Sequence, residues 1–140
     1  MKRYRSPGDL SSEIERLLAG NRASFHRSPL EEVSELLSTG RHYTWVGIYL
    51  TVGKTAAQRT EAGHGPHPSQ KARPESRSKI LVSIELAGRE LGVLDVESDR
   101  ANAFGSEDRV LLEKAADLLA RFLAVRGKYL VRRARAAAAD

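Results

Sequence analysis

Residues 80–98, ILVSIELAGRELGVLDVES, decide the fold of this chain. Apolar side chains stand at alternate positions from Ile80 to Leu86, which is the period of a β-strand. Ala87-Gly88 allows a tight reversal, because glycine adopts a positive φ without steric cost. Leu91–Ser98 then runs back as a second strand. The stretch therefore predicts a β-hairpin. We expect it at the centre of a sheet, because few of its residues are polar on either face of the strands.

One pair of charges does not suit a plain core strand. Asp95 and Glu97 are two residues apart, so their side chains leave the same face of the strand. Two carboxylates on one face of an apolar strand need water, a cation or a ligand. The structural interpretation pairs them with solvent, Lys79 or Arg89. The functional interpretation makes them the recognition site for the ammonium group of a ligand.

A second strand is predicted upstream, at residues 43–50, YTWVGIYL, which are rich in aromatic and β-branched residues. Trp45 and Tyr49 share one face of it with Gly47. Such a pair is either ordinary core or one wall of a ligand site. Residues 56–64 form a weaker candidate for a partner strand.

Two helices are predicted before these strands. Apolar residues at helical spacing from Leu10 to Leu18 indicate the first, with Asp9 or Ser11 as its N-cap. Residues 28–31, SPLE, are a stronger start signal for the second, because they supply an N-cap serine, a proline at the first helical position and a glutamate at the third. Gly40 is expected to end that helix.

The last predicted helix, residues 106–125, has an unusually wide apolar face. It carries two neighbouring apolar stripes, formed by Leu111, Ala115, Leu118, Phe122 and Val125, and by Leu112, Ala116, Leu119 and Leu123. A helix lying on a sheet needs only one stripe, so the second must pack on another helix. That helix is either the one over residues 10–18 or the same helix of a partner chain. We predict a homodimer through helix 106–125.

Composition bounds the class of protein. A chain of 140 residues with 41% hydrophobic and 29% charged residues is typical of one soluble domain, and no run approaches a membrane span. The N-terminus has no apolar segment of a secretory signal, so the predicted location is cytoplasmic. The net charge of +5 comes from residues 1–5 and 126–140, which leaves −2 for residues 6–125. Binding to nucleic acid is therefore not indicated.

No catalytic or metal motif is evident. His64 and His67 flank a Gly-Pro pair, but no further ligands of known geometry accompany them, so a solvated loop is the better interpretation and no metal site is predicted. Phosphate-binding and dinucleotide-binding glycine patterns are absent, and no cofactor is predicted. The sequence contains no cysteine, which excludes thiolate chemistry by its own residues.

The two strand motifs together resemble the GAF domain. WVGIYL at residues 45–50 and GVLDVES at residues 92–98 occur in the family's order, followed by Phe104, Glu107-Asp108 and Leu112-Glu113. The resemblance implies an α+β fold, with a central antiparallel sheet, N- and C-terminal helices packed on one face, and a ligand pocket on the other. Within the superfamily, the chain is most similar to the free methionine-(R)-sulfoxide reductase branch.

The resemblance also divides the chain. It implies a lead-in and helix at 1–27, a single compact GAF-like domain at 28–126, and a basic, Ala-rich tail at 127–140. Residues 65–78, with three of the five prolines, are expected to be a flexible loop. This loop replaces the longer pocket lid of the reductases.

By motif match, Trp45 and Tyr49 correspond to aromatic residues that hold the substrate in the reductases. Asp95 and Glu97 correspond to their acidic pair. Lys79 stands where that branch usually has a glutamate, so a cation here neutralises part of the acidic pair. These five residues are the candidate ligand-binding site.

Two functional predictions follow. The first is a non-catalytic module of bacterial signalling that senses a small molecule or forms dimers. The alternative is a reductase-like enzyme acting on methionine sulfoxide. The missing cysteines argue against the alternative, because sulfoxide reduction in that branch requires thiolates.

Overall fold

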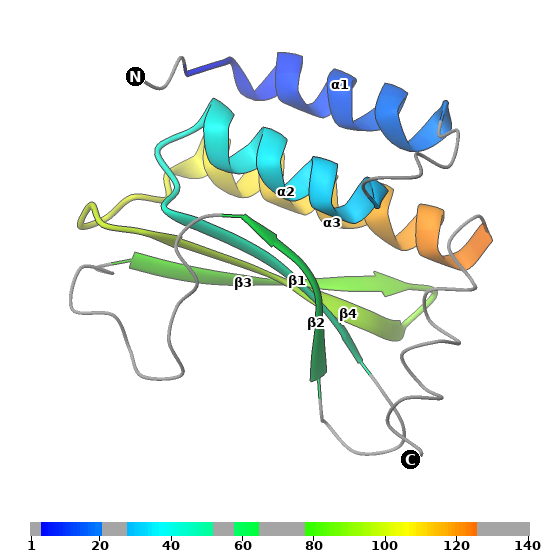
Figure 1. Ribbon diagram of the computed structural model, residues 1–140. Coiled ribbons are helices and arrows are strands. Elements are labelled where there is room, and N and C mark those ends of the chain that lie inside the picture. Colours follow the sequence, from blue (N-terminus) through cyan, green and yellow to red (C-terminus); the bar gives the residue numbers. More distant parts are fainter. Residues whose placement is uncertain (1–3, 21–27, 52–57, 65–77, 126–140) are drawn as a thin grey trace.

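The computed structural model describes residues 4–20, 28–51, 58–64 and 78–125. Its four strands form one antiparallel sheet in the order β2-β1-β4-β3, and three helices lie on one side of it (Figure 1). The predicted α+β class with helices on one face is therefore confirmed. In chain order the elements are α1 (Pro7–Ala19), α2 (Pro29–Gly40), β1 (Trp45–Thr51), β2 (Gln58–His64), β3 (Ser78–Leu86), β4 (Arg89–Ser98) and α3 (Ser106–Val125).

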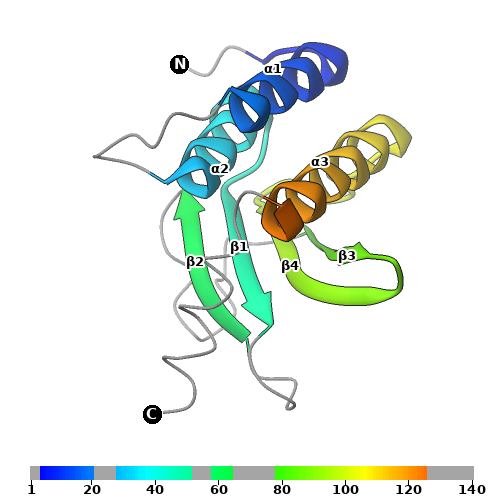
Figure 2. The same ribbon diagram turned by 90° about the vertical axis from the view of Figure 1, so that its right-hand side faces the viewer.

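The helices form two layers above the sheet. Helix α2 lies over β1 and β2, α3 lies over β3 and β4, and α1 packs on α2 and α3 (Figure 2). Alternate residues of β1, from Val46 to Leu50, point into the space between sheet and helices and are fully buried. The core is completed by Leu94 and Val96 of β4 and by the apolar faces of the helices.

Serine-proline pairs start both N-terminal helices. Ser28 Oγ accepts a hydrogen bond from Glu31 N at 3.2 Å, with Pro29 at the first helical position, as predicted. Helix α1 begins in the same way, because Ser6 Oγ accepts from Asp9 N at 3.1 Å. The predicted cap at Asp9 or Ser11 was therefore wrong. Helix α1 starts earlier than predicted, because Ser6 supplies a side-chain acceptor and Pro7 has a φ angle already suited to a helix.

The hairpin is confirmed, but its place in the sheet differs from the prediction. Ala87 and Gly88 both have positive φ, 53° and 78°, which is the geometry of a tight two-residue hairpin turn. Strand β4 is central, and Leu94–Ser98 is buried on both faces. Strand β3 is an edge strand of this sheet, with Leu81 61% exposed. The apolar alternation of β3 fits a strand covered on one face only, which sequence periodicity cannot distinguish from a central position.

Strands β1 and β4 approach each other closely at Gly92. A Cβ atom there would lie 2.3 Å from the carbonyl oxygen of Tyr49, so no other residue fits without moving the backbone. On its other side β1 pairs with β2, which confirms the weaker strand predicted within residues 56–64. Residues 65–77 of the predicted loop and the predicted tail at 127–140 lie outside the described residues.

Both apolar stripes of α3, apart from Val125, are covered within one chain. One faces the sheet and the other faces α1, whose Leu10, Ile14 and Leu18 are buried in the same core. Of the two partners that the sequence left open, α1 therefore covers the stripe that does not face the sheet. Val110 and Val125, near the two ends of α3, remain exposed. No helix in the described segments is long and apolar enough to cross a membrane.

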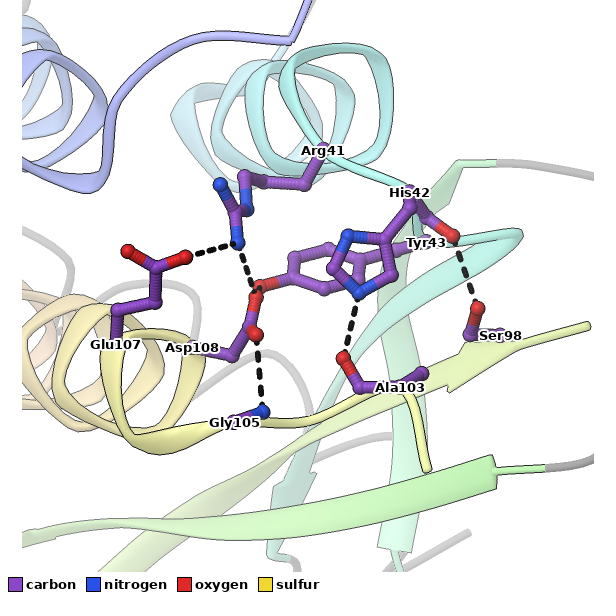
Figure 3. A network of polar contacts seen from close by, with 8 residues as sticks. All are labelled: Arg41, His42, Tyr43, Ser98, Ala103, Gly105, Glu107 and Asp108. Atoms are coloured by element: carbon purple, nitrogen blue, oxygen red, sulfur yellow. Dashed lines mark hydrogen bonds and ion pairs between the residues drawn. The ribbon is translucent and has the colours of Figure 1, made fainter. Parts of the chain in front are cut away.

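A buried carboxylate joins the start of α3 to the chain that leads into β1 (Figure 3). Asp108 Oδ1 accepts hydrogen bonds from Arg41 Nη2 at 2.7 Å and from the Tyr43 hydroxyl at 2.6 Å. Its Oδ2 accepts from Gly105 N at 3.1 Å. Glu107 lies farther out, with Oε1 3.6 Å from the Arg41 guanidinium.

The electrostatic balance of this network favours the charged carboxylate. Burial alone raises the pKa of Asp108, but the hydrogen bonds from Tyr43, Arg41 and Gly105 outweigh burial and hold the pKa below its usual value. Burial also raises the pKa of Tyr43, so its hydroxyl stays protonated as a donor. One ionised group thus links the first turn of α3 to the segment between α2 and β1.

We expect Asp108→Asn to lower the free energy of unfolding by about 2–4 kcal/mol, because it removes the charged acceptor of the hydrogen bonds from Arg41 and Tyr43 in a buried site. The matched control is Glu107→Gln, which removes a mainly exposed carboxylate from the same cation and should cost less than about 1 kcal/mol. Urea denaturation at pH 7 measures both. Equal losses for the two variants would contradict the assigned role of Asp108.

Candidate functional site

The predicted site residues gather on the face of the sheet that is turned away from the helices. Along β1, Trp45, Gly47 and Tyr49 alternate with the core-facing residues and therefore lie on this outer face. Strand pairing places the acidic residues of β4 and the lysine of β3 on the same face. The structure thus brings together all five: Trp45, Tyr49, Lys79, Asp95 and Glu97.

Two adjacent rows across the sheet define the arrangement. In the first row Glu97 lies between Trp45 and Lys79, its neighbours on β1 and β3. In the second row the β4 residue is Asp95, and its neighbour on β1 is Gly47. Directly opposed side chains in such pairs are about 5 Å apart at Cβ, so the carboxylates, the lysine and the indole form one cluster.

Gly47 makes room for the indole of Trp45. A Cβ atom at Gly47 would lie 2.8 Å from Trp45 Nε1 and 2.9 Å from Cζ2, so the ring lies across this glycine. Because Gly47 is the neighbour of Asp95, the indole is directed toward the carboxylate. Gly47 was not among the predicted site residues. A glycine inside a strand that is otherwise aromatic and β-branched is the signal that identifies such a close approach.

Asp95 is an unusual carboxylate for a central strand. Asp95 is only 5% exposed, and its Oδ1 makes no hydrogen bond of normal geometry within the described residues. Lys79 Nζ lies 3.8 Å from Oδ2, but the lysine side chain is 55% exposed, so the ion pair is partly solvated. Burial raises the pKa of Asp95 to about 6, and Glu97 adds to the rise, while Lys79 and the Trp45 indole oppose it.

This pKa has a direct consequence for stability. Because the pKa of Asp95 in the folded chain lies above its ordinary value of 3.8, protonation of Asp95 favours folding. That stabilisation is fully present below about pH 3.8 and is lost as the pH rises through about 6. At neutral pH the ionised Asp95 therefore costs stability, in contrast to Asp108, whose lowered pKa makes its charged form stabilising.

The helical side also carries grooves. One of about 770 Å³ lies between α1 and α2, and a smaller apolar one of about 240 Å³ lies between α1 and α3. Neither contains any of the five predicted site residues. Among the described side chains, no group of three or more histidines, cysteines, aspartates or glutamates could hold a metal ion.

Comparison with known proteins assigns the family. The sequence matches the GAF domain family over residues 10–123, and the chain therefore belongs to that family. No curated protein matches the sequence.

Solved structures show the same fold at low sequence identity. The free methionine-R-sulfoxide reductase of Neisseria meningitidis, in complex with its substrate, is similar with a TM-score of 0.73 and 19% identity, over 89% of this chain and 95% of that one. The corresponding Staphylococcus aureus enzyme with substrate gives 0.67 and 19%, over 88% and 99%. The GAF domain of a Coxiella burnetii phosphoenolpyruvate-protein phosphotransferase gives 0.73 and 16%, over 89% and 97%.

Trp45 is the only tryptophan of the chain, so its fluorescence reports on this site alone. Ionisation of the adjacent Asp95 should change the indole emission, and we expect a transition with a midpoint near pH 6. Asp95→Asn should abolish it, whereas Asp117→Asn on α3 should leave it unchanged. A wild-type midpoint near pH 4 would show that Asp95 is not shielded from solvent.

Proposed function

We propose that the chain is a non-catalytic GAF module that binds a small molecule on the outer face of its sheet. The observation that carries this proposal is the buried Asp95 beside Trp45, on a face that the helices do not need for packing. A carboxylate with a pKa raised by burial contributes no stability at neutral pH, and such perturbed groups concentrate at binding sites. GAF sensor modules of bacterial signalling proteins are the functional class with which this arrangement agrees.

The chemistry of the cluster favours a ligand with a cationic head and an apolar body. An ammonium group would find two carboxylates, Asp95 and Glu97, within one face of the sheet. The Trp45 indole, with Tyr49 two rows farther along β1, beyond Gly47, offers an aromatic surface for an apolar or thioether group. The Lys79 ammonium occupies part of the acidic site. A cationic ligand must therefore displace Lys79, or carry a carboxylate that pairs with it.

The reductase alternative has one supporting observation. Two similar structures are free methionine-R-sulfoxide reductases in complex with substrate, so an amino acid of that shape fits this fold. The reaction itself needs a thiolate to attack the sulfoxide sulfur and a second thiol to resolve the product as a disulfide. The sequence contains no cysteine to perform either step. We therefore propose binding without turnover, in the cytoplasm.

Methionine sulfoxide and methionine are the first probes to test. We expect either to shift the Trp45 emission in a saturable way at pH 7.5, with no oxidation of NADPH in a thioredoxin-coupled assay. Asp95→Asn should weaken binding at least about tenfold, because it removes the charge that meets the ammonium group.

Asp117→Asn is the matched control, since it makes the same chemical change on α3. Absence of any emission change with these probes and with a panel of small amines would contradict the proposed site. Turnover would contradict the non-catalytic assignment alone.

We further propose that two copies associate through α3. The exposed Val110 and Val125, together with the apolar groove formed by α1 and α3, support this arrangement. Light scattering of the pure protein should give twice the mass of the chain at micromolar concentration, and a monomer at every concentration would contradict it.

A further inference from the structure

The edge of the sheet at β3 is long and apolar. In the described part of the chain β3 pairs only with β4, so its other side presents a row of backbone N–H and C=O groups. Leu81 is 61% exposed on the outer face, and Ile80 and Val82 are only half-buried on the helix side. Edge strands of this length and composition are templates for pairing with another strand.

We propose that β3 pairs with β3 of a second copy of the chain, antiparallel and about a two-fold axis at Val82. The inference rests on the homodimer proposed above and specifies its centre. The two four-stranded sheets would then become one continuous sheet. Helix α3 packs on β3, so the two α3 helices would come to lie near each other on the helix side of that sheet.

The register follows from charge. An axis at Val82 places Lys79 opposite the partner's Glu85, and the symmetry makes this contact twice. The same register sets Ile80 opposite the partner's Ile84, so apolar residues meet on the helix side. Moving the axis to Ser83 removes both ion pairs, because Lys79 then faces Ala87 and Glu85 faces Leu81. Moving it to Leu81 sets Lys79 opposite Ser83 and shifts Glu85 to face Arg77, which precedes the strand.

The conformation of β3 permits this pairing. The register irregularity between β3 and β4 skips Leu91, so the extra residue belongs to β4 and the alternation of β3 stays regular through Glu85. Lys79 and Glu85 therefore share the outer face. The Lys79 side chain is 55% exposed despite its proximity to Asp95, which leaves it able to meet a partner.

Charged residues on an edge strand also serve to prevent pairing. Charged residues that prevent pairing carry one sign, so the same residues of a second copy repel them. Here the two charges are of opposite sign and stand at equal distances on either side of Val82, so a second copy is attracted. This self-complementary placement favours a specific two-fold contact between copies over a role in preventing edge pairing.

Because the chain has no cysteine, single cysteine variants can locate the axis. Only a residue on the axis lies opposite its own copy, so Val82→Cys should form an intermolecular disulfide with oxidised glutathione. Leu81→Cys is the matched control: it is more exposed than Val82 but lies opposite the partner's Ser83. We expect Val82→Cys to crosslink about tenfold faster. Equal rates, or a faster Leu81→Cys, would indicate random collision and overturn the proposal.

Charge reversal gives an independent measurement. Glu85→Lys places like charges opposite each other twice, and we expect it to weaken the dimer about tenfold or more in analytical ultracentrifugation. An equimolar mixture with Lys79→Glu restores both pairs and should restore the dimer. Glu32→Lys on α2, over the other edge of the sheet, is the control and should have no effect.

The outcomes separate the two claims. A wild-type dimer that Glu85→Lys leaves intact would overturn the β3 contact while leaving the proposed α3 dimer standing. A wild-type monomer at all concentrations would overturn both. Should Lys79→Glu fail to fold beside Asp95, the cysteine comparison still decides.

Discussion

The charged hydrogen bonds of Asp108 are the interaction on which the rest of the structure depends. They tie the first turn of α3 to Arg41 and Tyr43, in the segment between α2 and β1. Tyr43 is only two residues before Trp45, the first residue of β1, so the network holds the segment that leads into the strand of the outer-face aromatic residues. Breaking a buried ion pair of this kind is strongly destabilising, because the remaining charge loses its best-placed counter-charge in the interior.

The two faces of the sheet contribute differently to stability. The helix side is filled with apolar residues and holds the fold together. The outer side keeps a second carboxylate, Asp95, in conditions that oppose its ionisation. One buried aspartate is thus stabilised by donors, and the other is tolerated at a cost. This costly, incompletely compensated carboxylate beside an aromatic ring is the observation on which the proposed binding site rests.

The sequence predicted the elements whose signals are local. The hairpin turn, the Ser28 cap and the alternation of β1 depend on residues a few positions apart, and the structure has all three. The shared face of Asp95, Glu97, Trp45 and Tyr49 also follows from strand period and pairing. The edge position of β3 was missed because it depends on which strands neighbour it. The bonds of Asp108 were missed because their partners lie 65 and 67 residues away.

We propose that Asp95 is kept for binding at the expense of stability. The most direct measurement is the free energy of unfolding of Asp95→Asn and of the wild type at pH 7.5. The raised pKa of Asp95 predicts that the variant is more stable by about 1–3 kcal/mol at this pH, with the gain disappearing as the pH falls below about 4. A variant less stable than the wild type at pH 7.5 would show that Asp95 supports the fold, and would contradict the account.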